Sequence, residues 1–87
     1  MKQINYTAHA LEEMQRRGIS QEQVEAAYLQ PEQILPGRNQ RMIYQSRMNF
    51  DGDKHYLLRV FVDETTTPPV VVTVYRTSKI EKYWRMS

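Results

Sequence analysis

Residues 55–77 read HYLLRVFVDETTTPPVVVTVYRT and contain two apolar runs separated by a short polar segment with two prolines. His55–Val62 alternates between two sets of side chains, which is the period-two pattern of a β-strand. Val70–Thr77 is rich in β-branched residues and alternates in the same way, so it is the strongest predicted strand. Asp63–Pro69 is the loop expected between these two strands.

The alternation in the second strand divides its side chains between two faces. One face is apolar, and we expect it to pack on helices: Val70, Val72 and Val74. The other is mostly polar and partly open: Val71, Thr73, Tyr75 and Thr77.

Two further strands are predicted upstream of His55. Arg41–Met48 alternates along its length, and the Asp51-Gly52 dipeptide that follows favours a tight hairpin turn. Gln33–Leu35 is a candidate short edge strand that ends at Pro36-Gly37.

The residues before these strands carry helical signals. Ala8–Arg17 has apolar residues at helical spacing, with Thr7 as the expected N-cap and Gly18 just past the end. A second helix is expected to begin after Ser20, which has capping-box spacing, and to end before Pro31. Because the link between the helices is short, we expect a helical hairpin.

Helices followed by strands indicate an α+β fold, and the length predicts a single domain over residues 1–87. We expect an N-terminal helical hairpin packed on one face of a four-stranded, mostly antiparallel sheet, in the order ααββββ. A short C-terminal helical turn should follow, with Ser78 as its cap and with Ile80, Tyr83 and Trp84 facing inward.

The composition is that of an ordinary globular domain with a mild positive charge. The chain is 40% hydrophobic and 25% charged, and its net charge is +2. It has no cysteine, which fits a cytoplasmic location and provides no thiolate nucleophile. The N-terminus has no apolar region typical of a signal peptide, and apolar runs such as Val70–Val72 are too short to cross a membrane. We therefore expect no membrane association.

The sequence patterns disfavour metal-dependent and nucleotide-dependent enzymes. His9 and His55 stand in no metal-ligand spacing, and the three glycines form no phosphate-binding loop. Neither a metal nor a cofactor is therefore expected. Eight of the 12 basic residues are arginine, whose planar guanidinium suits phosphate, although a solvated arginine-rich surface is equally common.

The remaining polar residues suit metal-independent cleavage of RNA. That reaction needs a base for the 2′-hydroxyl group, cations for the charge on the phosphorane and an acid for the departing 5′-oxygen. His9 lies in the first turn of a helix, where the dipole favours a neutral imidazole that can act as a base. The candidate catalytic residues are His9, Arg17, Thr73, Tyr75 and Lys79. Further RNA contacts are expected from Arg16, Arg47, Arg59, Lys82 and Tyr83.

Each candidate also has an ordinary structural role. A first-turn histidine is commonly a surface or capping residue, and Arg17 suits the carbonyl groups at a helix end. Thr73 and Tyr75 favour any strand, and lysines near a terminus are usually solvated. The alternative to an enzyme is therefore a non-catalytic module that binds RNA or a protein with the same face, and a purely structural protein is a third possibility.

Short motifs frame the chain at both ends. The first group is Tyr6-Thr7-x-His9-Ala10, Met14, Arg17-Gly18-Ile19-Ser20, Val24 and Pro31, and the second is Val72–Lys79 with Lys82-Tyr83-Trp84. Together they resemble the small family known as domain of unknown function 4258. At Glu13 the chain departs from the pattern, because many relatives carry a basic residue there.

That family is similar in layout to the RelE-like and barnase–colicin-like metal-independent ribonucleases, which include the toxins of toxin–antitoxin pairs. The resemblance implies RNA as the substrate and an antitoxin or immunity protein as a partner. It also implies catalytic roles for His9, Arg17, Thr73 and Tyr75, with Lys79 next to them.

Overall fold

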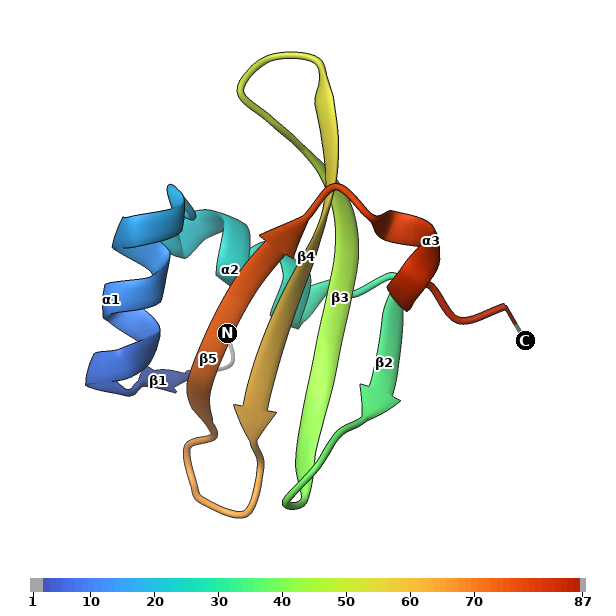
Figure 1. Cartoon of the computed structure of the whole chain (residues 1–87). Coiled ribbons are helices and arrows are strands. Elements are labelled where there is room, and N and C mark those ends of the chain that lie inside the picture. Colours follow the sequence, from blue (N-terminus) through green and yellow to red (C-terminus); the bar gives the residue numbers. More distant parts are fainter. Residues whose placement is uncertain (1–2, 87) are drawn as a thin grey trace.

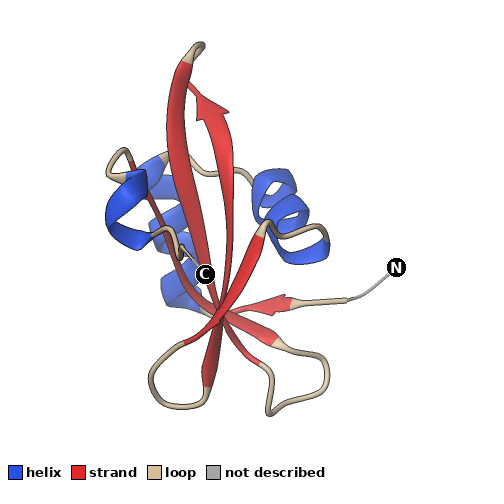
Figure 2. Ribbon diagram, turned by 90° about the vertical axis from the view of Figure 1, so that its right-hand side faces the viewer, coloured by secondary structure: helices blue, strands red, loops and turns tan. Residues whose placement is uncertain are grey.

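The computed structural model describes residues 3–86, which form three helices and a five-stranded mixed sheet (Figure 1). In chain order the elements are β1 (Asn5–Tyr6), α1 (Ala8–Arg17), α2 (Gln21–Leu29), β2 (Gln33–Pro36), β3 (Arg41–Phe50), β4 (Lys54–Asp63), β5 (Val70–Thr77) and α3 (Ile80–Tyr83). The strand order is β1-β5-β4-β3-β2, and all pairs are antiparallel except β1 with β5. Figure 2 shows the strands crossing at steep angles, with helices on both sides of this strongly twisted sheet.

The α+β class is confirmed, but the expectation of four strands is wrong. The additional strand, β1, has two residues, and Asn5 and Tyr6 pair in parallel with Val70 and Val71. A segment of this length shows no alternation in the sequence. Its position beside β5 in the folded chain is what makes it a strand.

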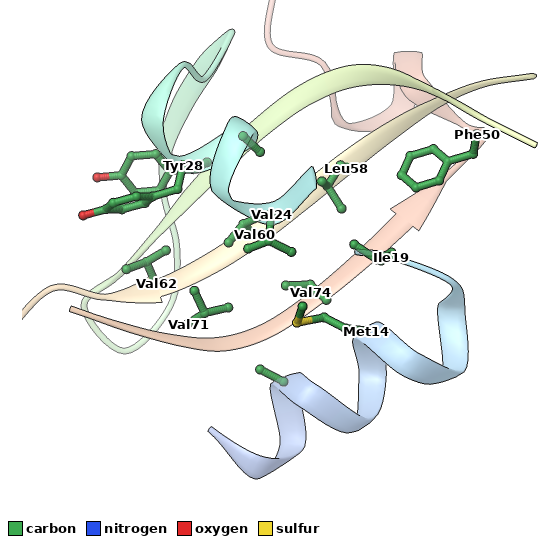
Figure 3. Packing of buried hydrophobic residues seen from close by; sticks show 13 residues of the cluster. Met14, Ile19, Val24, Tyr28, Phe50, Leu58, Val60, Val62, Val71 and Val74 are labelled. Atoms are coloured by element: carbon green, nitrogen blue, oxygen red, sulfur yellow. The ribbon is translucent and has the colours of Figure 1, made fainter. Parts of the chain in front are cut away.

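The two N-terminal helices pack on the sheet rather than on each other, so the predicted hairpin is wrong. α1 packs mainly on β5, whereas α2 packs on β4 and β3. Figure 3 shows Met14 of α1 beside Val74, and Val24 of α2 beside Val60. The left-handed backbone of Gly18 (φ 66°) ends α1 and redirects the chain. Each helix can therefore bury its own apolar stripe against the strands.

The local helix signals are confirmed. The Thr7 side chain accepts a hydrogen bond from the amide of Ala10, and Ser20 forms both bonds of a capping box with Gln23. The Asp51-Gly52 turn is also present, with both residues at positive φ.

A β-bulge reverses part of the alternation predicted for β5. The register with β4 shifts between Phe61 and its neighbour, which leaves Val72 as the extra residue. Val71 therefore joins Val74 in the core, and both are completely buried. Val72 is only half-buried, so the predicted core face of Val70, Val72 and Val74 is wrong in this respect.

The C-terminal segment lies against the sheet near β3 and β2 (Figure 1). Lys79 rather than Ser78 is the N-cap residue of α3, and among the described residues no side chain caps this helix. The Thr77 hydroxyl instead accepts a hydrogen bond from the Lys79 amide at 3.1 Å. Tyr83 and Trp84, which were expected to face inward, are half-buried.

Candidate functional site

A row of polar side chains crosses the face of the sheet opposite the main core. The cross-strand pairs place Gln33, Gln45, Arg59 and Tyr75 side by side, one from each of β2, β3, β4 and β5. Gln45 Nε2 donates a hydrogen bond to Gln33 Oε1 at 2.7 Å, and Arg59 Nε donates to Gln45 Oε1 at 2.9 Å. Arg59 Nη1 donates to the Tyr75 hydroxyl oxygen at 2.6 Å. We call these four residues the polar row.

Arg59 is the charged centre of the polar row. Its exposed fraction is 8%, and its guanidinium carbon lies 4.5 Å from the centre of the Tyr83 ring and 5.4 Å from that of Phe61. Within residues 3–86 it forms no ion pair with a carboxylate. Desolvating a guanidinium costs several kcal/mol, which a carboxylate commonly offsets. Here neutral acceptors and aromatic faces surround the cation, so its charge stays available to an anion.

Two tyrosine hydroxyl groups meet beside Arg59, and their pKa values are shifted in opposite directions. Burial raises the pKa of Tyr75, although the hydrogen bond from Arg59 works against that rise. The hydrogen bond with the Tyr75 hydroxyl lowers the pKa of Tyr83, and the positive charges of Lys82 and Arg59 lower it further. The Tyr75 oxygen therefore accepts a hydrogen bond from Arg59 while its own proton is directed at the Tyr83 oxygen.

Arg17 brings a second cation to this face from α1. Its guanidinium carbon lies 6.0 Å from the centre of the Tyr75 ring, and its Nε donates to Glu13 Oε1 at 2.8 Å. Glu13 also pairs with Arg16 at 2.7 Å, and the hydrogen bonds from Arg16 and Arg17 lower the pKa of Glu13 to about 2. Glu13 therefore orients Arg17 and neutralises one of two neighbouring charges.

The structure does not bring His9 into the polar row. His9 is exposed in the first turn of α1, eight residues before Arg17, which corresponds to about 12 Å along the helix. Among the described residues, no hydrogen bond or ring contact joins it to Arg59 or Tyr75. The predicted pairing of Arg17 with Tyr75 is present, and His9 stands apart from it.

The other predicted residues lie outside the polar row. Thr73 lies opposite Phe61 in the neighbouring row of cross-strand pairs, where it lines a cavity. Lys79 is exposed at the start of α3, and Lys82 Nζ lies 5.3 Å from the centre of the Tyr83 ring. Arg47 lies over Trp84 at 4.2 Å and forms an ion pair with Glu32 at 3.0 Å, so its charge is already neutralised.

The sequence patterns did not single out the two glutamines of the polar row. Gln45 is completely buried, and its amide also donates to the carbonyl oxygen of Tyr83 at 3.2 Å. Gln33 forms two hydrogen bonds with the backbone of Arg85, at 2.7 and 3.1 Å. These bonds fix the C-terminal segment beside the row. Nothing local in the sequence indicates the partners of either glutamine.

Two kinds of feature are absent from residues 3–86. That range contains no group of three or more histidine, aspartate or glutamate side chains arranged to hold a metal ion. None of its helices has the length and apolarity needed to cross a membrane.

Comparison with known proteins identifies the family but no characterised relative. No curated protein and no solved structure matches this chain. The model of one family, described as a domain of unknown function (DUF4258), matches residues 6–76, from the second residue of β1 to the next-to-last residue of β5. The chain therefore belongs to the DUF4258 family.

Proposed function

We propose that this protein binds RNA on the open face of its sheet and cleaves it without a metal ion. The observation that carries the proposal is Arg59, a buried guanidinium that has no carboxylate partner within residues 3–86 and is bonded to a tyrosine hydroxyl. A phosphodiester is an anion that would complete such a site. The surrounding rings of Tyr75, Tyr83 and Phe61 suit a nucleic acid, because bases stack on aromatic side chains.

The proposed reaction uses the 2′-hydroxyl group of the RNA as the nucleophile. A base removes its proton, the 2′-oxygen attacks phosphorus, and the bond from phosphorus to the 5′-oxygen breaks. The products are a 2′,3′-cyclic phosphate and a 5′-hydroxyl group, whose proton comes from Tyr75. Arg59 and Arg17 stabilise the additional negative charge of the phosphorane.

Tyr83 and His9 are the two candidates for the base. The ring centre of Tyr83 lies 6.1 Å from that of Tyr75, so Tyr83 is the candidate nearer to the polar row. Its pKa is also lowered. His9 has the more suitable chemistry near neutral pH but lies on the exposed side of α1. We propose the same reaction from the resemblance of the sequence motifs to RelE-like ribonucleases, and a toxin of a toxin–antitoxin pair is the form in which we expect it.

The test is cleavage of a single-stranded RNA in excess EDTA. We expect wild type to cleave, Arg59→Met to be inactive and Tyr75→Phe to lose about 100-fold or more in rate. Lys54→Gln is the control, because Lys54 is exposed at the start of β4. The proposal is wrong if wild type leaves RNA intact, or if Arg59→Met retains its full rate while folded by circular dichroism.

The exposed position of His9 favours a second candidate, a non-catalytic RNA-binding module. Such a module would bind RNA in a salt-sensitive manner without producing a cyclic phosphate. Multiple turnover of one RNA substrate would eliminate it. Replacing His9 by alanine separates the two candidate bases, because only a base role for His9 predicts that the cleavage rate falls while RNA affinity is kept.

A further inference from the structure

A cavity of about 410 Å³ lies beside the polar row, between the β2–β3 turn and the strands. Arg38 and Arg41 lie on its wall, together with the ring of Phe61 and the side chain of Thr73. Phe61 and Thr73 are two residues along their strands from Arg59 and Tyr75, which is a separation of about 6.8 Å. The cavity and the polar row are therefore neighbouring parts of one surface.

Positive charge dominates the cavity wall. No carboxylate belongs to the described residues that line it. Asp63 is paired opposite Arg41, but its carboxylate accepts two hydrogen bonds from Thr65, at 2.6 and 2.9 Å. One carboxylate beside two guanidinium groups leaves an excess of positive charge.

Arg41 also has an unsatisfied donor. Its Nε is buried and has no hydrogen-bond partner within residues 3–86. Buried polar groups are nearly always hydrogen-bonded in native proteins, so an orphan donor of a charged group calls for an explanation. Because Arg41 also lines the adjoining cavity, an anion bound there would offer an acceptor to its guanidinium group.

The turn that carries these arginines has an unusual backbone. Asn39 and Gln40 have φ values of 56° and 62°, and the Arg41 amide donates to the Arg38 carbonyl oxygen at 3.1 Å. Two consecutive residues with positive φ define a type I′ turn, and glutamine rarely occupies this conformation. Strained residues of this kind cluster at ligand sites, where the surrounding structure holds them in place.

We propose that this cavity binds the phosphate and sugar of the nucleotide next to the one held by Arg59. The inference rests on the proposed binding of RNA and extends it to a second subsite. Arg38 and Arg41 would contact the phosphate, and the Thr73 hydroxyl would hydrogen-bond to a sugar or phosphate oxygen. The cavity volume falls within the range of about 300–1,000 Å³ typical of small-ligand sites.

The probe is a 2′-O-methylated uridine hexamer, which cannot be cleaved. Its affinity is measured by fluorescence anisotropy at several salt concentrations. Arg38→Gln and Arg41→Gln should each weaken binding about 10-fold, since a charge-assisted contact is lost. Each should also reduce the slope of log affinity against log salt by about 0.7, the value for one phosphate of a single strand. Arg38 is exposed, so its replacement should leave the fold intact.

The outcomes distinguish the subsite from the proposed function. Lys54→Gln removes one exposed charge and should change neither the affinity nor the salt slope. If Arg38→Gln and Arg41→Gln bind the hexamer as Lys54→Gln does, while Arg59→Met does not bind, the subsite is wrong and RNA binding stands. If the Arg38 and Arg41 variants are impaired and Arg59→Met binds normally, the cavity is an RNA site and the proposed function falls. Absence of binding by wild type overturns both.

Discussion

Replacing Tyr75 by phenylalanine removes one hydroxyl group and tests whether the polar row stabilises the fold. That oxygen accepts a hydrogen bond of 2.6 Å from Arg59, whose side chain is too buried to be rehydrated freely. A hydrogen bond from a charged group contributes about 1.5–3 kcal/mol. We therefore expect the free energy of unfolding to fall by about 2 kcal/mol, and the melting temperature by roughly 8–16 °C for a domain of this size.

The measurement is equilibrium unfolding in urea, followed by the fluorescence of Trp84, the single tryptophan of the chain, and by circular dichroism. A double-mutant cycle with Arg59→Met isolates the bond, because Tyr75→Phe should cost under about 0.5 kcal/mol once the guanidinium is gone. Tyr56→Phe is the matched control from β4 and should change stability by less than about 0.5 kcal/mol. A coupling energy below about 0.5 kcal/mol between Arg59 and Tyr75 would refute the reasoning.

Four other substitutions test further features. Tyr6→Phe should stabilise by about 1 kcal/mol, because the Tyr6 hydroxyl is buried without a partner within residues 3–86. Burial raises its pKa from 10.0 to about 12, so wild type should lose stability as the pH rises through that interval and the variant should lose less. The pKa of Glu13 is lowered from 4.5 to about 2, so its contribution to the free energy of unfolding is present above pH 4.5 and is lost as the pH falls toward 2. Glu13→Gln should therefore lose less stability than wild type over this pH interval, as measured by urea unfolding at several pH values. Gly18→Ala should cost about 1–2 kcal/mol in urea unfolding at neutral pH, because φ is 66°. Gln33→Ala should accelerate hydrogen exchange at the Arg85 amide while global stability changes by less than about 1 kcal/mol. An unchanged exchange rate would show that Gln33 does not hold the C-terminal segment.

Several residues of the candidate site could be predicted from residue types and from strand alternation. The period of two placed Tyr75 and Thr73 on the face away from the helices, and this placement is confirmed for Tyr75 by its bond to Arg59. Arg17 was expected near this strand, and its guanidinium does approach the Tyr75 ring. His9 could not be placed in the same way, because a helical wheel gives its direction around α1 but not the distance from α1 to the rest of the site.

The sequence by itself determined the features that depend on neighbours a few residues apart. The Thr7 cap, the Ser20 capping box and the Asp51-Gly52 turn each close a bond or a backbone conformation within a short span, so local residue types suffice to specify them. The same holds for the helices and the long strands, which apolar periodicity locates to within about two residues at each end.

Only the tertiary structure decided which residues from distant segments pair with one another across the sheet. The strand β1, the bulge at Val72 and the polar row depend on how distant segments are paired and in which register. The bonds of Arg59 join residues 14 and 16 positions apart, and those of Gln33 to the Arg85 backbone join residues 52 apart. Register is fixed by the combined packing of all strands and helices, because a shift of one residue would move every side chain to the opposite face. A charged residue in a strand is therefore visible in the sequence, but its burial without a carboxylate partner is a property of the assembled sheet.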